Sequence, residues 1–376
     1  MKFRRRLTCL CLLLATLLSV SACAQEQQRL FIIGQDLGSV RDYLDSGCCP
    51  EPDGVTAYLS FYNLMSADAG YGGLGIDAEG NPLLQEHDWG AGAVNAWNSA
   101  SEFEDIALTI GLNLTENEHP GALDRLVAGE YDENIRQLVR FFQKIDNAVY
   151  LRIGYEFDGF WNQGYHDRQR YIAAWRRIVD GLRAAGVENV QFVWQAAVLP
   201  LDEMTDGVHE NLRDWYPGDD YVDWMAFSSF IGLDERPAIE VEKQPPTARE
   251  LTDELLNFAR ERGKPVMIAE ASPQGYDLAR GFNANLTPGW DGPQAQGRRL
   301  VSPEQIWDEW YAPLFDYVNE NRDVVRALAY INCNWDIQDM WDTPYESGFW
   351  GDTRLQASPE IARRFSAAIE NWRANP

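Results

Sequence analysis

The feature that most constrains the fold of this chain is a strand-like apolar segment followed by a helix-like one, repeated eight times. Each strand candidate is a short, continuous run rich in Val, Ile and aromatic residues, as in parallel strands buried on both faces. The eight segments are residues 30–34, 55–61, 106–112, 149–153, 190–194, 222–227, 265–269 and 327–331. Eight strands alternating with helices favour an α/β fold, a (β/α)₈ barrel, over a doubly wound sheet.

Helix start and stop signals lie between these strands. Residues 134–145 and 168–185 carry apolar residues at helical spacing, and Gly186 caps the second helix. Thr247 to Glu250 forms a capping box for a helix that ends near Gly263. Two further helices open with a serine cap followed by proline, at Ser302-Pro303-Glu304 and Ser358-Pro359-Glu360. We therefore predict one barrel domain over residues 30–376.

Three long irregular segments each follow a predicted strand and precede a helix: residues 63–102, 231–246 and 272–301. In a (β/α)₈ barrel such loops lie at the carboxyl end of the strands, where the active site is found. Loops of this length usually have a function. Their tryptophans, Trp89, Trp97 and Trp290, favour function over disordered insertion.

The first residues resemble an export signal. Lys2 and residues 4–6 are positively charged, and the apolar run 7–20 is too short to cross a bilayer. The run ends in Ser21-Ala22-Cys23, which resembles a bacterial lipobox. We predict a signal peptide over 1–22, lipidation of Cys23 and a short tether over 23–29. The protein would then sit in the bacterial cell envelope, at the outer membrane or cell surface, held by lipid alone; ordinary secretion is the alternative.

The net charge of the chain and the spacing of its possible metal ligands indicate which partners and cofactors it can bind. The chain has 32 Lys and Arg against 58 Asp and Glu, a net charge of −26. This charge repels nucleic acid and anionic polysaccharides, so it favours a neutral substrate. The four histidines are scattered and lack metal-ligand spacing, so we expect no metal and no cofactor. We also expect a monomer.

Three cysteines, Cys48, Cys49 and Cys333, lie in the predicted barrel. Cys48 follows the first strand and Cys333 the eighth, which are neighbours in a closed barrel. We expect a disulfide between Cys333 and either Cys48 or Cys49, with a Cys48–Cys49 bond as the alternative.

Two glutamates stand at strand ends on roughly opposite sides of the predicted mouth. Glu156 lies just past the fourth strand, and Glu270 follows the seventh. A protonated carboxyl and an ionised carboxylate in one cleft are what glycoside hydrolysis requires. The first donates a proton to the leaving oxygen, and the second attacks the anomeric carbon.

Four segments around these glutamates resemble the clan A glycoside hydrolases, most closely family 26, which includes β-mannanases and β-1,3-xylanases. They are Gly34-Gln35-Asp36 and residues 152–159, 215–224 and 264–272. The resemblance implies that Glu156 is the acid/base and Glu270 the nucleophile of a retaining enzyme.

The chain departs from the clan at two places. Tyr155 stands where the clan usually has Asn and family 26 mannanases have His. Mannan, β-1,3-xylan, a β-glucan or an algal glycan therefore all stay open as substrates. Near strand six, where the clan tends to have a Tyr that holds the nucleophile, the chain has Ser228-Ser229-Phe230.

Other residues near the predicted mouth are candidates for substrate binding. They are Tyr155, Asp158, Trp161, Trp194, Gln195 and Trp335. Asp158 has an equal alternative role as a loop cap, and Arg152 either orients a carboxylate or forms a structural ion pair. Trp175 and Trp224 fit a helix face and a strand, and we expect both in the core.

Together these features predict a retaining, endo-acting glycoside hydrolase for a neutral β-linked polysaccharide. One alternative is a surface glycan-binding lipoprotein on a catalytically inactive barrel. Another is a transglycosidase that remodels envelope glycans.

Overall fold

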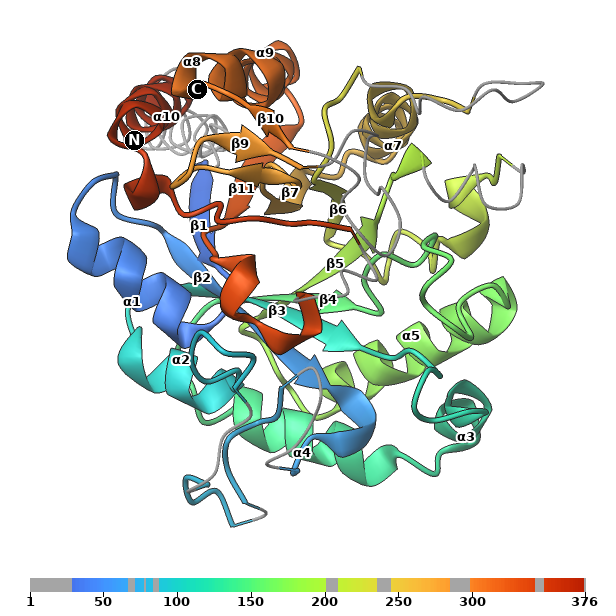
Figure 1. Ribbon diagram of the computed structural model, residues 1–376. Coiled ribbons are helices and arrows are strands. Elements are labelled where there is room, and N and C mark those ends of the chain that lie inside the picture. The colour runs from blue at the N-terminus through green and yellow to red at the C-terminus, as the bar shows by residue number, and fades with distance from the viewer. Residues whose placement is uncertain are drawn as a thin grey trace, which may run out of the picture.

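A computed structural model describes residues 29–66, 72–77, 79–83, 88–200, 209–234, 245–284, 298–341 and 348–374. Its centre is a closed barrel of parallel strands, surrounded by helices (Figure 1). The strands are β1 (Leu30–Gly34), β2 (Gly54–Ser60), β3 (Ala107–Asn113), β4 (Val149–Ile153), β5 (Val190–Ala196), β6 (Trp224–Ser229), β7 (Val266–Ala271) and β11 (Val325–Ile331). The predicted (β/α)₈ fold is confirmed, and each strand begins and ends within two residues of its prediction.

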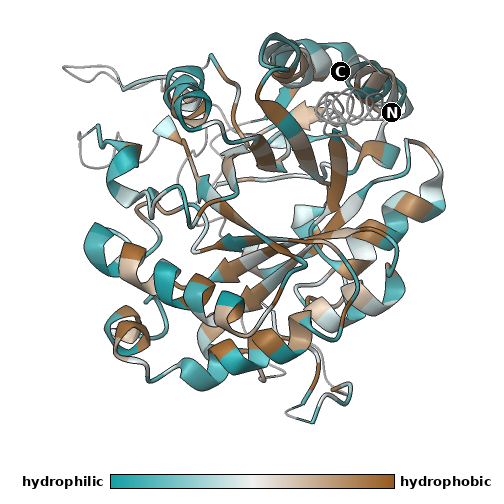
Figure 2. Ribbon diagram, turned by 180° about the vertical axis from the view of Figure 1, so that it is seen from behind, coloured by the Kyte–Doolittle hydropathy of each residue, from teal (hydrophilic) through white to brown (hydrophobic). Residues whose placement is uncertain are grey.

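The helices that surround the barrel begin and end close to the predicted signals. They are α1 (Leu37–Ser46), α2 (Ala96–Glu102), α3 (Ala122–Ala128), α4 (Asp132–Phe142), α5 (Arg168–Ala184), α7 (Ala248–Arg262), α8 (Pro303–Ile306), α9 (Ala312–Glu320) and α10 (Pro359–Ala374). The capping box at Thr247 is formed in both directions, and Gly263 ends α7 in the left-handed conformation. Apolar residues of the helices turn toward the strands and polar ones toward solvent (Figure 2).

The core has two layers, one inside the barrel and one between the barrel and its helices. The inner layer consists of alternate strand residues: Ile32, Tyr150, Val193, Trp224, Ala226, Met267, Ala269, Ala327 and Ala329. The outer layer holds the other strand residues and the apolar helix faces, including Trp175. Trp175 and Trp224 are thus both core residues, as expected.

The long segments after the strands are more ordered than the sequence indicated. The segment 63–102 contains α2. The segment 272–301 contains a small antiparallel sheet of β8 (Tyr276–Asp277), β9 (Phe282–Asn283) and β10 (Arg299–Leu300). Strands of two residues are too short to show an apolar alternation, so the sequence did not reveal them. Trp290 lies outside the described residues.

Within the described residues, no helix is both long and apolar enough to span a bilayer. The predicted signal peptide, Cys23 and most of the tether lie outside the described residues.

Candidate active site

Glu270 reaches the inside of the barrel because of an irregularity in β7. Met267 and Ala269 already face the inner core, so regular alternation would turn Glu270 outward. The pairing with β6 shifts at this point: Phe227 pairs with Ile268, but Ser228 pairs with Glu270. This bulge turns the next side chain inward, as bulges near active sites do. Glu270 is 7% exposed at the bottom of the mouth.

Two groups hold the Glu270 carboxylate. Arg152, fully buried on β4, forms an ion pair with Glu270 Oε1 through Nη1. The Tyr58 hydroxyl on β2 donates to the same oxygen at 3.0 Å. Burial and then the charge of Glu270 raise the pKa of Tyr58, so the hydroxyl keeps its proton and acts as a donor. Arg152 thus places its positive charge against the carboxylate, and Tyr58 donates to the same oxygen.

The Arg152 guanidinium lies between two aromatic rings. Its central carbon is 5.1 Å from the ring centroids of both Tyr58 and Tyr155. Gly111 on β3 provides the space for this arrangement, because a Cβ there would lie 2.8 Å from the Tyr58 ring and 2.9 Å from Arg152 Nη2. Tyr155, half-buried beside the cleft, therefore contacts the residue that pairs with Glu270.

Glu156 stands in a different environment. Its Oε1 accepts a hydrogen bond from Ser228 Oγ at 2.7 Å, and its Oε2 accepts one from Trp161 Nε1 at 3.3 Å. Burial, followed by the charge of Glu270, raises the pKa of Glu156 to about 8, although the Ser228 hydrogen bond opposes the rise. Glu156 is thus held mainly protonated at neutral pH.

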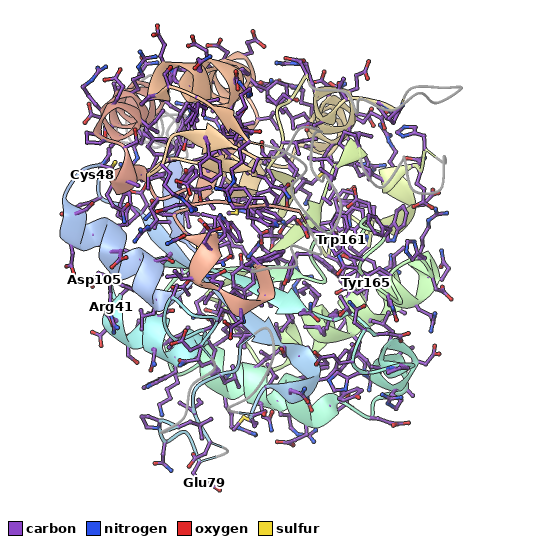
Figure 3. The ribbon with its side chains drawn as sticks, viewed as in Figure 1. Arg41, Cys48, Glu79, Asp105, Trp161 and Tyr165 are labelled. Carbon is purple, nitrogen blue, oxygen red and sulfur yellow. The ribbon has the colours of Figure 1, made fainter. Side chains whose placement is uncertain are left out.

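The loop after β4 presents Glu156 in an unusual backbone conformation. Its φ is +54°, in the left-handed region that non-glycine residues seldom adopt. The Asn162 amide donates to the Glu156 carbonyl at 2.7 Å, and Tyr165 fixes the end of the loop by accepting from Leu114 N at 2.9 Å. Figure 3 labels Trp161 and Tyr165 in this loop. Strain of this kind persists where surrounding contacts enforce it, often at active sites.

A chain of side chains connects the two glutamates through the floor of the cleft. Gln195 Nε2 donates to Ser228 Oγ at 3.0 Å, and Gln195 Oε1 accepts from Arg152 Nη1 at 3.0 Å. Ser228 donates to Glu156, and Arg152 pairs with Glu270. Gln195 is fully buried, so it positions other site residues and is not open to a substrate. The sequence had instead suggested direct contact between Gln195 and the substrate.

Asp158 caps the loop after β5. It is 8% exposed, and its two oxygens accept hydrogen bonds from the backbone amides of Ala197 and Val198 at 2.5 and 3.0 Å. Val198 has φ +48°, so these bonds hold a strained turn. Of the two roles predicted for Asp158, these bonds support the cap, and the substrate-binding role stays a prediction.

Trp194 was wrongly predicted to bind substrate. It alternates with Val193 and Gln195 on β5 and so faces outward, toward the helices. It is fully buried, stacked on Phe157 at 4.5 Å and in contact with Phe258 of α7.

Trp335 lies at the mouth but is also buried. It is 2% exposed, donates from Nε1 to Thr353 Oγ1 at 3.0 Å and packs against Trp341 and Trp350. A sugar platform needs an open ring face, and little of the Trp335 ring is open, so its contact with substrate stays a prediction. Trp341, half-buried, is the more accessible ring of this cluster.

The predicted disulfide to Cys333 does not form. Cys333 is fully buried just past the carboxyl end of β11, where Gln35 Nε2 lies 3.9 Å from its sulfur. Cys48 and Cys49 follow α1, which carries the chain back to the amino end of the barrel, beside α10. The sulfurs of Cys48 and Cys49 lie 2.9 Å apart as free thiols, so the vicinal pair is the one that the fold brings together. Cys48 lies at the edge of the view in Figure 3, far from Trp161.

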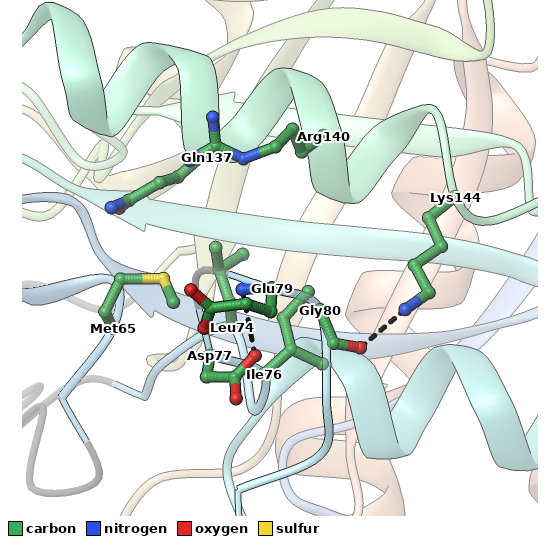
Figure 4. A pocket seen from close by; sticks show the side chains of 9 residues that line it. All are labelled: Met65, Leu74, Ile76, Asp77, Glu79, Gly80, Gln137, Arg140 and Lys144. Carbon is green, nitrogen blue, oxygen red and sulfur yellow. Dashed lines mark hydrogen bonds between the residues drawn. The ribbon is translucent and has the colours of Figure 1, made fainter.

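A second hollow of about 210 Å³ lies outside the barrel, between the segment after β2 and α4 (Figure 4). Two of its polar groups have protein partners: Lys144 Nζ donates to the Gly80 carbonyl at 2.6 Å, and Asp77 Oδ1 accepts from Glu79 N at 3.0 Å. This hollow holds no counterpart of the Glu156–Glu270 arrangement. Among the described residues, no cluster of His, Cys, Asp and Glu could hold a metal ion.

Tyr58 and Gly111 are site residues that the sequence reading missed, and Ser228 was noted only for not being a tyrosine. A strand tyrosine looks like any other buried aromatic residue until its register is known. Tyr58 on β2 and Gly111 on β3 are register partners. Counting alternate residues back from the end of each of these strands would have shown that both residues face the inside of the barrel.

The chain is 32% identical over 343 residues to a β-1,3-xylanase from Alcaligenes sp., covering 91% of this chain and 63% of that protein. It is also 32% identical over 347 residues to β-1,3-xylanase TXYA from Vibrio sp., covering 92% of this chain and 65% of that protein. The chain is similar to β-1,3-xylanases. It spans slightly under two thirds of the length of these curated relatives.

Among solved structures, the catalytic domain of a family 26 endo-β-1,4-mannanase from Bacillus sp. JAMB-750 matches with a TM-score of 0.54. The sequences are 15% identical, and the match covers 92% of this chain and 87% of that one. At this identity the likeness shows the barrel fold. No protein-family model matches the chain.

Proposed function

We propose that this chain is a retaining glycoside hydrolase that cleaves the β-1,3-xylan backbone internally. The observation that carries the proposal is the contrast between the two glutamates. Glu270 is held as an anion by Arg152 and Tyr58, while the pKa of Glu156 is raised to about 8. One acid and one nucleophile in a single cleft are the two groups that retaining hydrolysis uses.

In the first step, Glu270 attacks the anomeric carbon and forms an ester with it. The bond from that carbon to the bridging oxygen breaks, and Glu156 gives its proton to this oxygen. In the second step, Glu156 takes a proton from water, whose oxygen attacks the same carbon and displaces Glu270. Two displacements at one carbon retain its configuration.

The mutual influence of the two glutamates suits both steps. The negative charge of Glu270 is the second largest cause of the raised pKa of Glu156. When Glu270 becomes an ester it loses this charge, so the pKa of Glu156 falls and the group ionises. Glu156 is then prepared to act as a base in the second step.

Xylan is favoured as the substrate by two observations. The curated relatives at 32% identity are both β-1,3-xylanases. In addition, Tyr155 stands where family 26 mannanases have histidine, which argues against mannan as the competing substrate. A neutral polymer also agrees with the charge of −26.

The experiment is hydrolysis of β-1,3-xylan, mannan, β-glucans and agar-type glycans by the protein and by its Glu156→Ala and Glu270→Ala variants. We expect xylan to yield oligosaccharides of mixed length, and proton NMR to show the β-anomer of the new reducing end first. Either alanine variant should fold normally and lose activity. An initial α-anomer, or unchanged activity in both variants, would refute the mechanism.

We further propose that Cys23 carries lipid and tethers the enzyme to the cell envelope. The charged residues 4–6, the apolar run 7–20 and the small residues before Cys23 support this proposal. Labelling of the expressed protein with a radioactive fatty acid should be lost in Cys23→Ala. Label retained in that variant would contradict the proposal.

A further inference from the structure

A small polar hollow opens beside the catalytic cleft at the carboxyl ends of β2 and β3. Ser60 ends β2 and Asn113 ends β3, and the two are register partners. Tyr58 and Gly111 form the next inward-facing pair, two residues earlier on each strand. Because Tyr58 contacts Glu270, the hollow adjoins the place where the nucleophile acts.

Asn113 is the notable residue of this hollow. It is 7% exposed, and its Oδ1 accepts hydrogen bonds from Thr115 N at 3.1 Å and Thr115 Oγ1 at 3.2 Å. The amide nitrogen on the same side chain has no hydrogen-bond partner among the residues that the structure describes. This nitrogen is not among the fully buried unpaired atoms, so it remains accessible from the hollow and can donate to a ligand there.

The other walls of the hollow are polar and fixed. The Asn63 amide and His119 Nε2 are 3.1 Å apart, and the Tyr62 ring packs edge-on against His119 at 5.3 Å. Glu118, at the rim, is exposed. The volume of about 10 Å³ gives room for about one water molecule. A sugar hydroxyl is about the size of a water molecule and can accept from an N–H donor, so it fits this space.

We propose that this hollow is a sugar subsite in which the Asn113 amide donates to one hydroxyl of the ring bound next to Glu270. The inference rests on the proposed function and adds a residue that sets specificity. A site that hydrogen-bonds a substrate hydroxyl discriminates strongly against an analogue without it, because its buried polar group is then left unpaired.

The experiment measures binding of β-1,3-xylotetraose, and of analogues lacking one hydroxyl, by titration calorimetry. The protein carries Glu156→Gln to slow hydrolysis, with or without Asn113→Asp. Aspartate keeps the oxygen that accepts from Thr115 but lacks the amide hydrogens. We expect Asn113→Asp to raise the Kd of xylotetraose about tenfold to a hundredfold. One deoxy analogue should show the same loss with Asn113 present and no further loss in the aspartate variant.

Two controls separate the possible failures. Asn319→Asp on α9 adds the same charge outside the barrel and should leave the Kd unchanged. If Asn113→Asp strongly lowers the melting temperature, Asn113→Ala takes its place in the same binding measurements. The subsite is overturned if the wild-type protein cleaves xylan but each deoxy analogue loses the same affinity with Asn113 present as in its variant. A wild-type protein that cleaves no glycan overturns the proposed function itself.

Discussion

The hydroxyl of Ser228 offers a direct test of how the environment of Glu156 controls activity. Ser228 Oγ lies 2.7 Å from Glu156 Oε1 and donates to it. This bond stabilises the ionised carboxylate more than the neutral acid, and it lowers the pKa of Glu156 against the rise caused by burial. Ser228→Ala should therefore raise the pKa.

The size of the effect follows from the strengths of the two hydrogen bonds. A bond to a charged group contributes about 1.5–3 kcal/mol, and a bond between neutral groups about 0.5–1.5 kcal/mol. The difference, roughly 1.4 kcal/mol, corresponds to about one pH unit. Glu156 must be protonated to donate, so kcat/KM falls as the pH rises through its pKa of about 8. The midpoint of this fall should move to roughly pH 9 in Ser228→Ala.

The assay is kcat/KM for xylan hydrolysis between pH 4 and pH 11, with reducing ends as the readout. Ser229→Ala is the matched control, because Ser229 is also buried but faces the other side of β6 and makes no side-chain hydrogen bond to the glutamates. Its profile should match the wild type. A midpoint in Ser228→Ala that stays near pH 8 or moves down, with the control unchanged, would refute the reasoning.

Three further changes test the rest of the site. Glu270→Gln should reduce kcat by at least about 10⁴-fold and, by removing a negative charge, lower the pKa of Glu156, as measured by carbon NMR titration. Gly111→Ala places a Cβ 2.8 Å from the Tyr58 ring and should cost about 1–3 kcal/mol of stability in thermal melting, together with activity. Asp158→Asn weakens the cap on the β5 loop and should lower the free energy of unfolding in urea by about 1–3 kcal/mol; an unchanged midpoint would contradict the cap.

The barrel could be predicted because parallel strands buried on both faces give continuous apolar runs, which sequence shows well. The same property hid the direction of individual side chains. In such a run no polar residue marks the outer face, so Trp194 and Gln195 looked equally able to reach the mouth. Only the register shows that one faces the helices and the other the catalytic floor.

The cysteine prediction failed for a geometric reason. Strands β1 and β11 are indeed neighbours, but proximity of strands does not place residues at the same end. Helix α1 returns the chain to the amino end before Cys48, while Cys333 remains at the carboxyl end. Glu156 and Glu270 were recognised as a pair because each lies at or just past the carboxyl end of its strand, where no helix separates it from the mouth.

The bulge in β7 makes the direction of the Glu270 side chain depend on the register between β6 and β7 more than on local composition. If Ser228 paired with Ala269 instead of Glu270, the bulge would be lost, the pairing with β6 would be regular and the carboxylate would turn toward the helix layer. The barrel would close as before, and with more regular hydrogen bonding. A substitution that favours this regular pairing would therefore misplace Glu270 without unfolding the barrel, and a thermal-stability screen alone would not detect the loss.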